Sequence, residues 1–414
     1  MVSSNKALRG VQLMGVALAL ITTVVACGSD DDEPAAGSGG EGGASGMGET
    51  GGTGGDGNDA GDAGGMGGMG GMGVPGTGTF APTGEPLEAP DMTWTWVDVP
   101  DSFCRDGSTA GLGLSLNSAS DKVMIFMQGG GACFDSFTCG TNPANVALQK
   151  GEQIAGVFNR TQADNPVKDW SFVFVPYCTG DVHLGTKEDG MIEGVGPQMF
   201  VGRLNLLAYL NRIVPTFSDA SQVLLTGISA GGFGAAASME IVQWAFGDIP
   251  VTAIDDSGPP MSTEYLASCL QEKWSTTWGF DKSVLQDCGA DCDGPGDYSL
   301  PYSIHVAKKF PNHMGGLIET TGDVVITGFY GFGANDCTGS FFTAIPQDTF
   351  RMGLLDYRAT IMELDGDLGT FFIEGNQHTW LAANSFYEFE VGGVRMIDWF
   401  TDIVEGTAAA HVGP

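Results

Sequence analysis

Ser229 stands in the stretch Gly227-Ile228-Ser229-Ala230-Gly231, where an apolar run gives way to small residues. A serine on a sharp turn from a strand into a helix has a strained backbone. Glycines two positions away on either side remove the collisions that larger residues would make there. Such a turn raises the hydroxyl into a cleft, with a helix N-terminus behind it. The pattern predicts that Ser229 is the nucleophile of an acyl-transfer reaction.

A serine hydroxyl is a weak nucleophile without a base beside it, and the chain has five histidines. His378 follows the apolar run 370–373 through a short loop, so we expect it at the carboxyl end of a strand, where the base must lie. A surface loop histidine is the alternative interpretation. The other histidines precede the serine, lie near a predicted helix or stand in the polar tail: His183, His305, His313 and His411.

The third group should be an acid that follows a strand between the serine and the histidine. Asp323 comes just after the run 316–321 and before a predicted helix. Asp336 lies in a glycine-rich loop with no clear strand before it. We predict Asp323 as the acid and keep Asp336 as the second candidate. The resulting order of serine, acid and histidine is that of the α/β-hydrolases.

Acyl transfer also needs amide groups that stabilise the oxyanion. The amide of Ala230, directly after the serine, is one candidate. Gly130 and Gly131 are the others, because they belong to a glycine-rich loop that follows the apolar run 122–127. A plain glycine turn is the alternative for this loop. The chemistry needs neither a metal nor an organic cofactor.

Apolar runs of strand length alternate with segments of helical spacing through the second part of the chain. The predicted strands are 122–127, 171–175, 222–226, 251–254, 316–319 and 370–373. The predicted helices are 200–214, 232–246, 347–362 and 393–403. Continuous apolar strands belong to a sheet that is covered on both faces. We therefore predict an α/β-hydrolase-like fold, with a mostly parallel central sheet and helices on both faces.

The N-terminus has the layout of an export signal. Lys6 and Arg9 precede an apolar run of about 15 residues, which is short for a transmembrane helix. The run ends in residues 24–27, which resemble the lipobox of bacterial lipoproteins. This resemblance implies cleavage before Cys27, acylation of that cysteine, and an anchor in the outer membrane or at the cell surface.

We divide the chain into a signal peptide (1–27), a linker (28–90), one globular domain (91–406) and a tail (407–414). The linker is dominated by glycine, with repeated GGM units and no Lys or Arg. Such a segment cannot bury enough apolar surface to fold. As a glycine-rich coil it would span roughly 40–45 Å, which suits a tether.

The cysteine content indicates the compartment in which the domain folds, and its net charge excludes some classes of partner. Its eight cysteines, an even number in an exported chain, predict up to four disulfides. A zinc site is the alternative for Cys288 and Cys292, although their spacing is poor for that metal. Residues 91–414 hold 39 acidic against 15 basic side chains. This balance excludes nucleic acid as a partner and disfavours highly anionic polymers.

Five sequence blocks together resemble the pectin acetylesterase and Notum family of carboxylesterases. In order they read C-R-D-G-S (104–108), Q-G-G-G-A-C-F (128–134), P-Y-C-T-G-D-V (176–182), G-I-S-A-G-G (227–232) and D-D-S-G (255–258). Two positions depart from the family's pattern: Gln128 replaces a Glu, and Ala132 stands where plant members have Trp.

The resemblance implies roles for particular residues. The implied catalytic triad is Ser229, Asp323 and His378. The implied oxyanion hole consists of the amides of Gly130, Gly131 and Ala230. The implied early disulfides are Cys104–Cys178 and Cys133–Cys139.

The sequence thus predicts a surface-tethered serine carboxylesterase. Its expected substrate is an acyl ester, an O-acetyl group on a polysaccharide in the first place, or another small ester. Its expected contact with a membrane is the lipid anchor at Cys27. Two alternatives remain: a non-catalytic surface-binding lipoprotein on a hydrolase scaffold, and a lipid or polyester esterase.

Overall fold

The computed structural model describes residues 82–341, 343–364 and 366–414. The predicted signal peptide, the predicted lipidation site Cys27 and most of the predicted linker lie outside the described residues.

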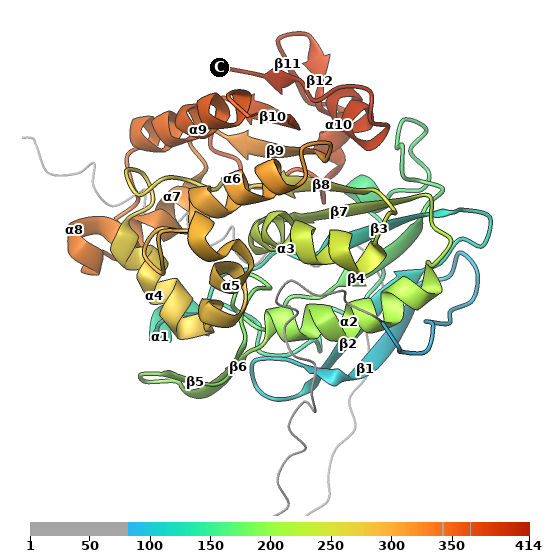
Figure 1. Ribbon diagram of the computed structural model, residues 1–414, viewed down its shortest axis with the longest axis horizontal. Helices are drawn as coiled ribbons and strands as arrows, with labels where there is room; N and C mark the ends of the chain where they lie inside the picture. The colour runs from blue at the N-terminus through green and yellow to red at the C-terminus, as the bar shows by residue number, and fades with distance from the viewer. Residues whose placement is uncertain (1–81, 342, 365) are drawn as a thin grey trace, which may run out of the picture. The chain divides into compact units, whose positions relative to one another are not determined.

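The described chain is built around a nine-stranded sheet with the order β1-β2-β4-β3-β7-β8-β9-β10-β13 (Figure 1). The pairs β1–β2 and β2–β4 are antiparallel, and every other pair is parallel. The strands are β1 (Thr95–Phe103), β2 (Thr109–Ser115), β3 (Lys122–Met127), β4 (Ser171–Val175), β7 (Gln222–Ile228), β8 (Val251–Asp256), β9 (Met314–Thr320), β10 (Asp367–Ile373) and β13 (His411–Val412). The sheet is mostly parallel, as the sequence predicts.

Successive strand residues supply two separate apolar cores, one on each face of the sheet. In β3, for example, Ile125 belongs to one core and Phe126 to the other. The first core is shared with α2 (Gly202–Thr216), α3 (Ala230–Phe246), α4 (Ser268–Trp278), α6 (Ser299–Lys309) and α9 (Gln347–Met362). The second is shared with α10 (Met396–Val404). Because both faces are covered, the strands can be apolar throughout.

Shorter elements complete the fold. The helices are α1 (Ser136–Gly140), α5 (Val284–Cys288), α7 (Val324–Tyr330) and α8 (Ala334–Cys337). Two small hairpins are formed by β5 (Lys187–Ile192) with β6 (Gly196–Phe200), and by β11 (Glu390–Val391) with β12 (Val394–Arg395). In the range that the structure describes, no helix combines the length and apolar character needed to span a bilayer.

The structure extends the globular part at both ends relative to the predicted boundaries of 91 and 406. The amide of Thr83 donates to the side-chain oxygen of Asn211 in α2 at 2.7 Å, and the amide of Leu87 donates to Thr216 Oγ1 at 2.7 Å. At the other end, β13 lies within the predicted tail and pairs with β10. Both additions lack a strong apolar period, so only their contacts reveal that they are packed.

Four disulfides link the described cysteines: Cys104–Cys178, Cys133–Cys139, Cys269–Cys337 and Cys288–Cys292. The first two are the pairs that the family resemblance implies. The fourth replaces the zinc alternative, because both of those thiolates are used in a bond. Four disulfides are typical of an oxidising compartment outside the cytosol.

Candidate active site

The turn between β7 and α3 holds Ser229 in a strained backbone conformation, with φ 55° and ψ −122°. A side chain at Gly231 would overlap the Met127 carbonyl, and one at Gly227 would overlap the Gly231 carbonyl. The two glycines are therefore required by close backbone approach, which is the physical reason for their spacing around the serine. The hydroxyl-bearing residue also precedes the first turn of a 17-residue helix, whose N-terminus carries partial positive charge.

Asp323 and His378 form a hydrogen-bonded pair beside this turn. His378 Nδ1 lies 2.7 Å from Asp323 Oδ2. The other oxygen, Asp323 Oδ1, accepts the amides of Val325 at 2.8 Å and Ile326 at 2.9 Å at the start of α7. Because those amides fix the carboxyl group, its second oxygen is aimed at the imidazole. Asp336, the second candidate from the sequence, is exposed and takes no part in this contact.

The loop that carries His378 is attached to the end of β8. Asp256 Oδ2 accepts the amides of Trp380 and Leu381, both at 2.7 Å. Next to it, Ser257 Oγ accepts the amide of Thr379 at 3.2 Å. These contacts join residues more than 120 positions apart in the chain. They hold the histidine loop without using the imidazole itself.

Ser229 is attached to the same strand end, since its amide donates to the Asp256 carbonyl at 2.7 Å. Asp256 therefore ties the serine turn and the histidine loop together. No direct hydrogen bond joins the Ser229 hydroxyl to His378 within the part of the chain that the structure describes. In ligand-free enzymes such contacts are often loose and tighten only when substrate binds.

The glycine-rich loop after β3 lies against the serine turn. A Cβ at Gly129 would stand 3.2 Å from the Ser229 Cβ. The amides of Gly130, Gly131 and Ala230 make no hydrogen bond to another described residue, so they are available to a ligand oxygen. All three residues line the same cavity as Ser229.

His183, which precedes the serine in the chain and is not among the residues predicted for the site, lies behind this loop. Its Nε2 is 2.9 Å from the carbonyl oxygen of Gln128. Burial lowers the pKa of His183 to about 4, an effect that its hydrogen bond to Gln128 only partly offsets. A neutral imidazole at this point donates to the carbonyl and fixes the start of the glycine loop. The side chain of Gln128 adds a second tie, accepting the amide of Tyr177 at 3.0 Å.

Two titrating groups at the site have shifted pKa values. Burial disfavours the charged form of His378, but the Asp323 carboxylate outweighs it and raises the pKa of the imidazole above its ordinary 6.5. Burial raises the pKa of Asp256 to about 6, against the opposing effect of the hydrogen bonds from Leu381, Trp380 and Ser257. The neighbouring charge thus determines the direction of the shift for His378, and desolvation determines it for Asp256.

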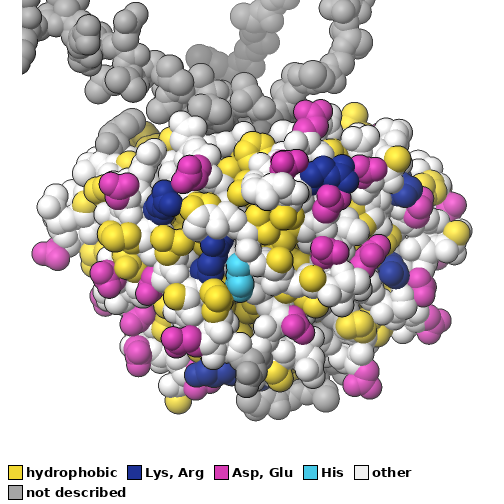
Figure 2. All heavy atoms as spheres, turned by 90° about the horizontal axis from the view of Figure 1, so that it is seen from above, with side chains coloured by type: hydrophobic (Ala, Val, Ile, Leu, Met, Phe, Trp, Pro, Cys, Tyr) yellow, Lys and Arg dark blue, Asp and Glu magenta, His cyan; other side chains and the backbone are white. Residues whose placement is uncertain are grey.

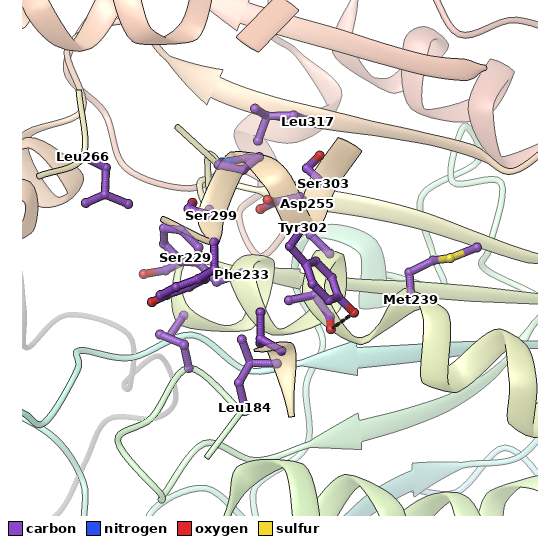
Figure 3. A pocket seen from close by; sticks show the side chains of 18 of the residues that line it. Leu184, Ser229, Phe233, Met239, Asp255, Leu266, Ser299, Tyr302, Ser303 and Leu317 are labelled. Atoms are coloured by element: carbon purple, nitrogen blue, oxygen red, sulfur yellow. Dashed lines mark hydrogen bonds between the residues drawn. The ribbon is translucent and has the colours of Figure 1, made fainter. Parts of the chain in front are cut away.

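A mostly apolar cavity of about 150 Å³ extends from Ser229 between α3 and α6 over β8 and β9 (Figure 3). Its walls include Leu184, Phe233, Met239, Leu266 and Leu317. Because Ser229 and the glycine loop form part of its wall, the cavity is suitable for the acyl part of a substrate.

The acidic excess of the domain is visible on its surface. On the face shown in Figure 2, acidic side chains occur over the whole surface, and Lys and Arg side chains are fewer. No group of three or more His, Cys, Asp or Glu side chains that could hold a metal ion occurs among residues 82–341, 343–364 and 366–414.

Sequence comparisons point to esterases. A sequence model of the pectinacetylesterase family matches residues 88–287. The chain is 33% identical over 147 residues to the palmitoleoyl-protein carboxylesterase notum2 of Xenopus laevis, covering 32% of this chain and 28% of that protein. It is 27% identical over 172 residues to the palmitoleoyl-protein carboxylesterase NOTUM of Drosophila melanogaster, covering 37% and 26%. The matched part thus spans less than a third of either relative.

Structural comparison covers more of the chain. The structure of the Wnt deacylase Notum from Drosophila aligns with a TM-score of 0.59 and 18% identity, over 77% of this chain and 95% of that one. At this identity the likeness shows the fold, and the fold is that of the Notum-like α/β-hydrolases. Together, the family match and the relatives support membership of the pectinacetylesterase and Notum family.

Proposed function

We propose that the chain is a serine carboxylesterase that works through an acyl-enzyme. The Ser229 oxygen attacks the ester carbonyl while His378 Nε2 takes the hydroxyl proton, and the tetrahedral oxyanion is held by the free amides of the glycine loop and Ala230. The C–O bond to the alcohol then breaks, and His378 returns the proton to the leaving oxygen. Water repeats the sequence on the acyl-enzyme and releases the acid. Asp323 keeps the imidazole proton on Nδ1 throughout.

The observation that carries this proposal is the attachment of the serine turn and the histidine loop to one strand end. The serine turn and the histidine loop are both bonded to Asp256, and the imidazole is aimed by a carboxyl group that two amides fix. A surface loop histidine would need none of these contacts. The arrangement supports a base and a nucleophile that are held in mutual reach.

The cavity supports an acyl group larger than acetyl. Cavities of about 150 Å³ in other proteins admit a ligand the size of benzene. We therefore propose that acyl groups of about four to six carbons are better substrates than the acetyl group that the sequence predicts. A lipid or polyester ester fits this part of the site as well as an acylated glycan does.

The alcohol part of the substrate would remain outside the cavity, and the side chain of His378, which returns a proton to it, is 18% exposed. A polysaccharide can be accommodated on that side because only its acyl group needs to enter. The net acidity of the domain favours a neutral or heavily esterified glycan over a polyanion.

We also propose that the enzyme is exported and tethered through an acylated Cys27. The four disulfides support export, and the acidic glycine-rich segment supports a tether. Replacing Cys27 with Ser should move the protein from the membrane fraction to the soluble fraction, with unchanged hydrolysis of a soluble ester. Retention of the variant in the membrane fraction would contradict the anchor.

Labelling with a fluorophosphonate probe tests the chemistry. The folded parent should be labelled, and Ser229→Ala should lose the label together with at least about 10⁴-fold in kcat/KM. Ser238→Ala, in the same helix, is the matched control and should label like the parent. A folded parent that resists the probe would instead identify a non-catalytic binding protein on a hydrolase scaffold.

A further inference from the structure

Asp255 is a buried acid in the wall of the acyl cavity. It is the penultimate residue of β8, is only 5% exposed, and lines the same cavity as Ser229. Its carboxyl group lies against the first turn of α3, where a side chain at Gly232 would overlap Oδ1. A Cβ at Gly258 would come within 2.7 Å of the same oxygen. The carboxyl group is therefore at the serine end of α3.

Neither oxygen of Asp255 has a hydrogen-bond partner of normal geometry among the described residues. Burial raises the pKa of this carboxyl well above its ordinary 3.8, the Asp256 charge raises it further, and the nearby Gly258 amide opposes the rise. No cation is among these influences. A buried carboxyl without a counter-charge stays protonated, and it then has one donor and one acceptor to offer.

Some of the other polar groups in the cavity wall have hydrogen-bond partners, and one does not. The Tyr302 hydroxyl donates to the Ala237 carbonyl at 2.9 Å (Figure 3). The indole nitrogen of Trp274, in contrast, is buried and lacks a partner within the described chain. Buried polar groups are nearly always paired, so two unpaired groups in one apolar cavity indicate a ligand that carries polar atoms of its own.

Asp255 lies within reach of an acyl chain bound at Ser229. In the sheet register Asp255 pairs with Gly227, two residues before the serine. With strands about 4.8 Å apart and a rise of about 3.3 Å per residue, the Cα atoms of Ser229 and Asp255 are roughly 8 Å apart. An acyl group of about four to six carbons, the size that the cavity admits, covers that order of distance.

We propose that the cavity recognises a hydroxyacyl group, whose hydroxyl lies far from the ester carbonyl and exchanges hydrogen bonds with the Asp255 carboxyl. This inference rests on the proposed function, because it places the ester carbonyl at Ser229. A hydroxyl both donates and accepts, as a protonated carboxyl does. An ammonium group would need an ionised Asp255, and a carboxylate on the substrate would be disfavoured by Asp256 and Glu319, two buried acids that interact electrostatically with Asp255.

The test compares methyl 6-hydroxyhexanoate with methyl hexanoate, measured by titration of the released acid. The full-length parent should prefer the hydroxy ester by about tenfold in kcat/KM, which corresponds to one buried hydrogen-bonded group. Asp255→Leu should abolish this preference while retaining or raising the rate with methyl hexanoate. Asp255→Asn, which keeps a donor and an acceptor, should retain part of the preference.

Two controls make the result specific. Methyl 2-hydroxyhexanoate places the hydroxyl beside the carbonyl, so its rate should respond to Asp255→Leu no more than that of methyl hexanoate. Met239→Leu changes an apolar wall residue at similar volume and should leave the preference intact. The proposal is wrong if the parent prefers methyl hexanoate or methyl 6-aminohexanoate, or if Asp255→Leu keeps the hydroxy preference.

Binding separates this inference from the proposed function. Ser229→Ala cannot form the acyl-enzyme, so both esters can be titrated against it by calorimetry without turnover. Tighter binding of the hydroxy ester, lost again in Ser229→Ala/Asp255→Leu, supports the recognition site even if the parent proves not to be an esterase. Equal binding of the two esters, with an active parent, overturns the recognition site alone.

Discussion

Asp323 and Asp255 are two buried aspartates near the carboxyl ends of neighbouring strands, and they differ in their partners. Asp323 accepts three hydrogen bonds, from two helix amides and from His378. Asp255 accepts none of normal geometry from the described residues. The difference shows that burial alone does not assign a role to a carboxyl group. The fully bonded acid is suited to holding a catalytic base, and the unbonded one to contacting a ligand.

The largest effect should follow from Asp323→Asn. Asn has only one oxygen. If its amide nitrogen faces His378, it cannot accept the hydrogen bond from Nδ1; if its oxygen faces His378, the amides at the start of α7 lose their acceptor. We expect kcat/KM for a simple ester to fall by about 10⁴-fold. Asp255→Asn is the matched control and should change the same rate by less than about threefold. Equal losses in the two variants would remove the functional distinction between these acids.

The pH profiles of the parent and of Asp323→Asn test whether the loss of activity comes from the missing carboxylate charge. The neutral imidazole is the active form, so the rate should fall as pH decreases through the pKa of His378, which lies above 6.5. Removing the Asp323 charge lowers that pKa, so the residual activity of Asp323→Asn should extend to lower pH than the parent activity does. An unshifted acidic limb would indicate that Asp323 does not act on the base.

A smaller loss should follow from Asp256→Ala, which removes the acceptor for the Trp380 and Leu381 amides. The histidine loop then loses its anchor, and a displacement of about 1 Å is enough for a loss on the order of 10²-fold. Asp256→Asn is the control, because its oxygen can still accept both amides and should retain most of the activity. If the Ala variant keeps full activity, the loop is held by other contacts.

The parts of the fold that the sequence predicts are those with strong local patterns. Residues 122–127 and 171–175 are apolar and β-rich, and 347–362 has a clear helical period; all three ranges match elements of the structure. The sequence pattern does not predict the edge strand β1, because Pro100 and polar residues interrupt its apolar character. The helix predicted at 393–403 begins only at Met396, because a short hairpin precedes it.

The site shows the same division between local and long-range information. The serine turn is encoded within five residues, and its strained backbone explains the glycines. Asp256 and Asp255 could not be assigned from the sequence, because their significance depends on residues far along the chain and on the cavity between α3 and α6. Both belong to the block 255–258, whose family resemblance indicates the region but assigns no role to either side chain.

A still smaller effect should appear in stability. The raised pKa of Asp255 means that the folded chain binds this proton more tightly than the unfolded chain does. The resulting stabilisation is present at low pH and is lost as pH rises from about 4 toward the raised pKa. Asp255→Asn avoids the cost of ionisation, so its Tm should exceed that of the parent by a few degrees at pH 8, and by less at pH 5. A lower Tm than the parent at pH 8 would show that the carboxyl group has a stabilising partner.

The smallest effect should come from Glu374→Gln, in the same loop as His378. Glu374 Oε1 lies 3.2 Å from Arg351 Nη1, and the two side chains are 69% and 41% exposed. Exposed ion pairs contribute about 0–1 kcal/mol and are screened by salt. We expect kcat/KM to change by less than about twofold, and the difference to vanish at high ionic strength. A loss comparable with that of Asp256→Ala would mean that the surface ion pair positions the histidine, and the buried carboxyl would then no longer be the principal anchor of the loop.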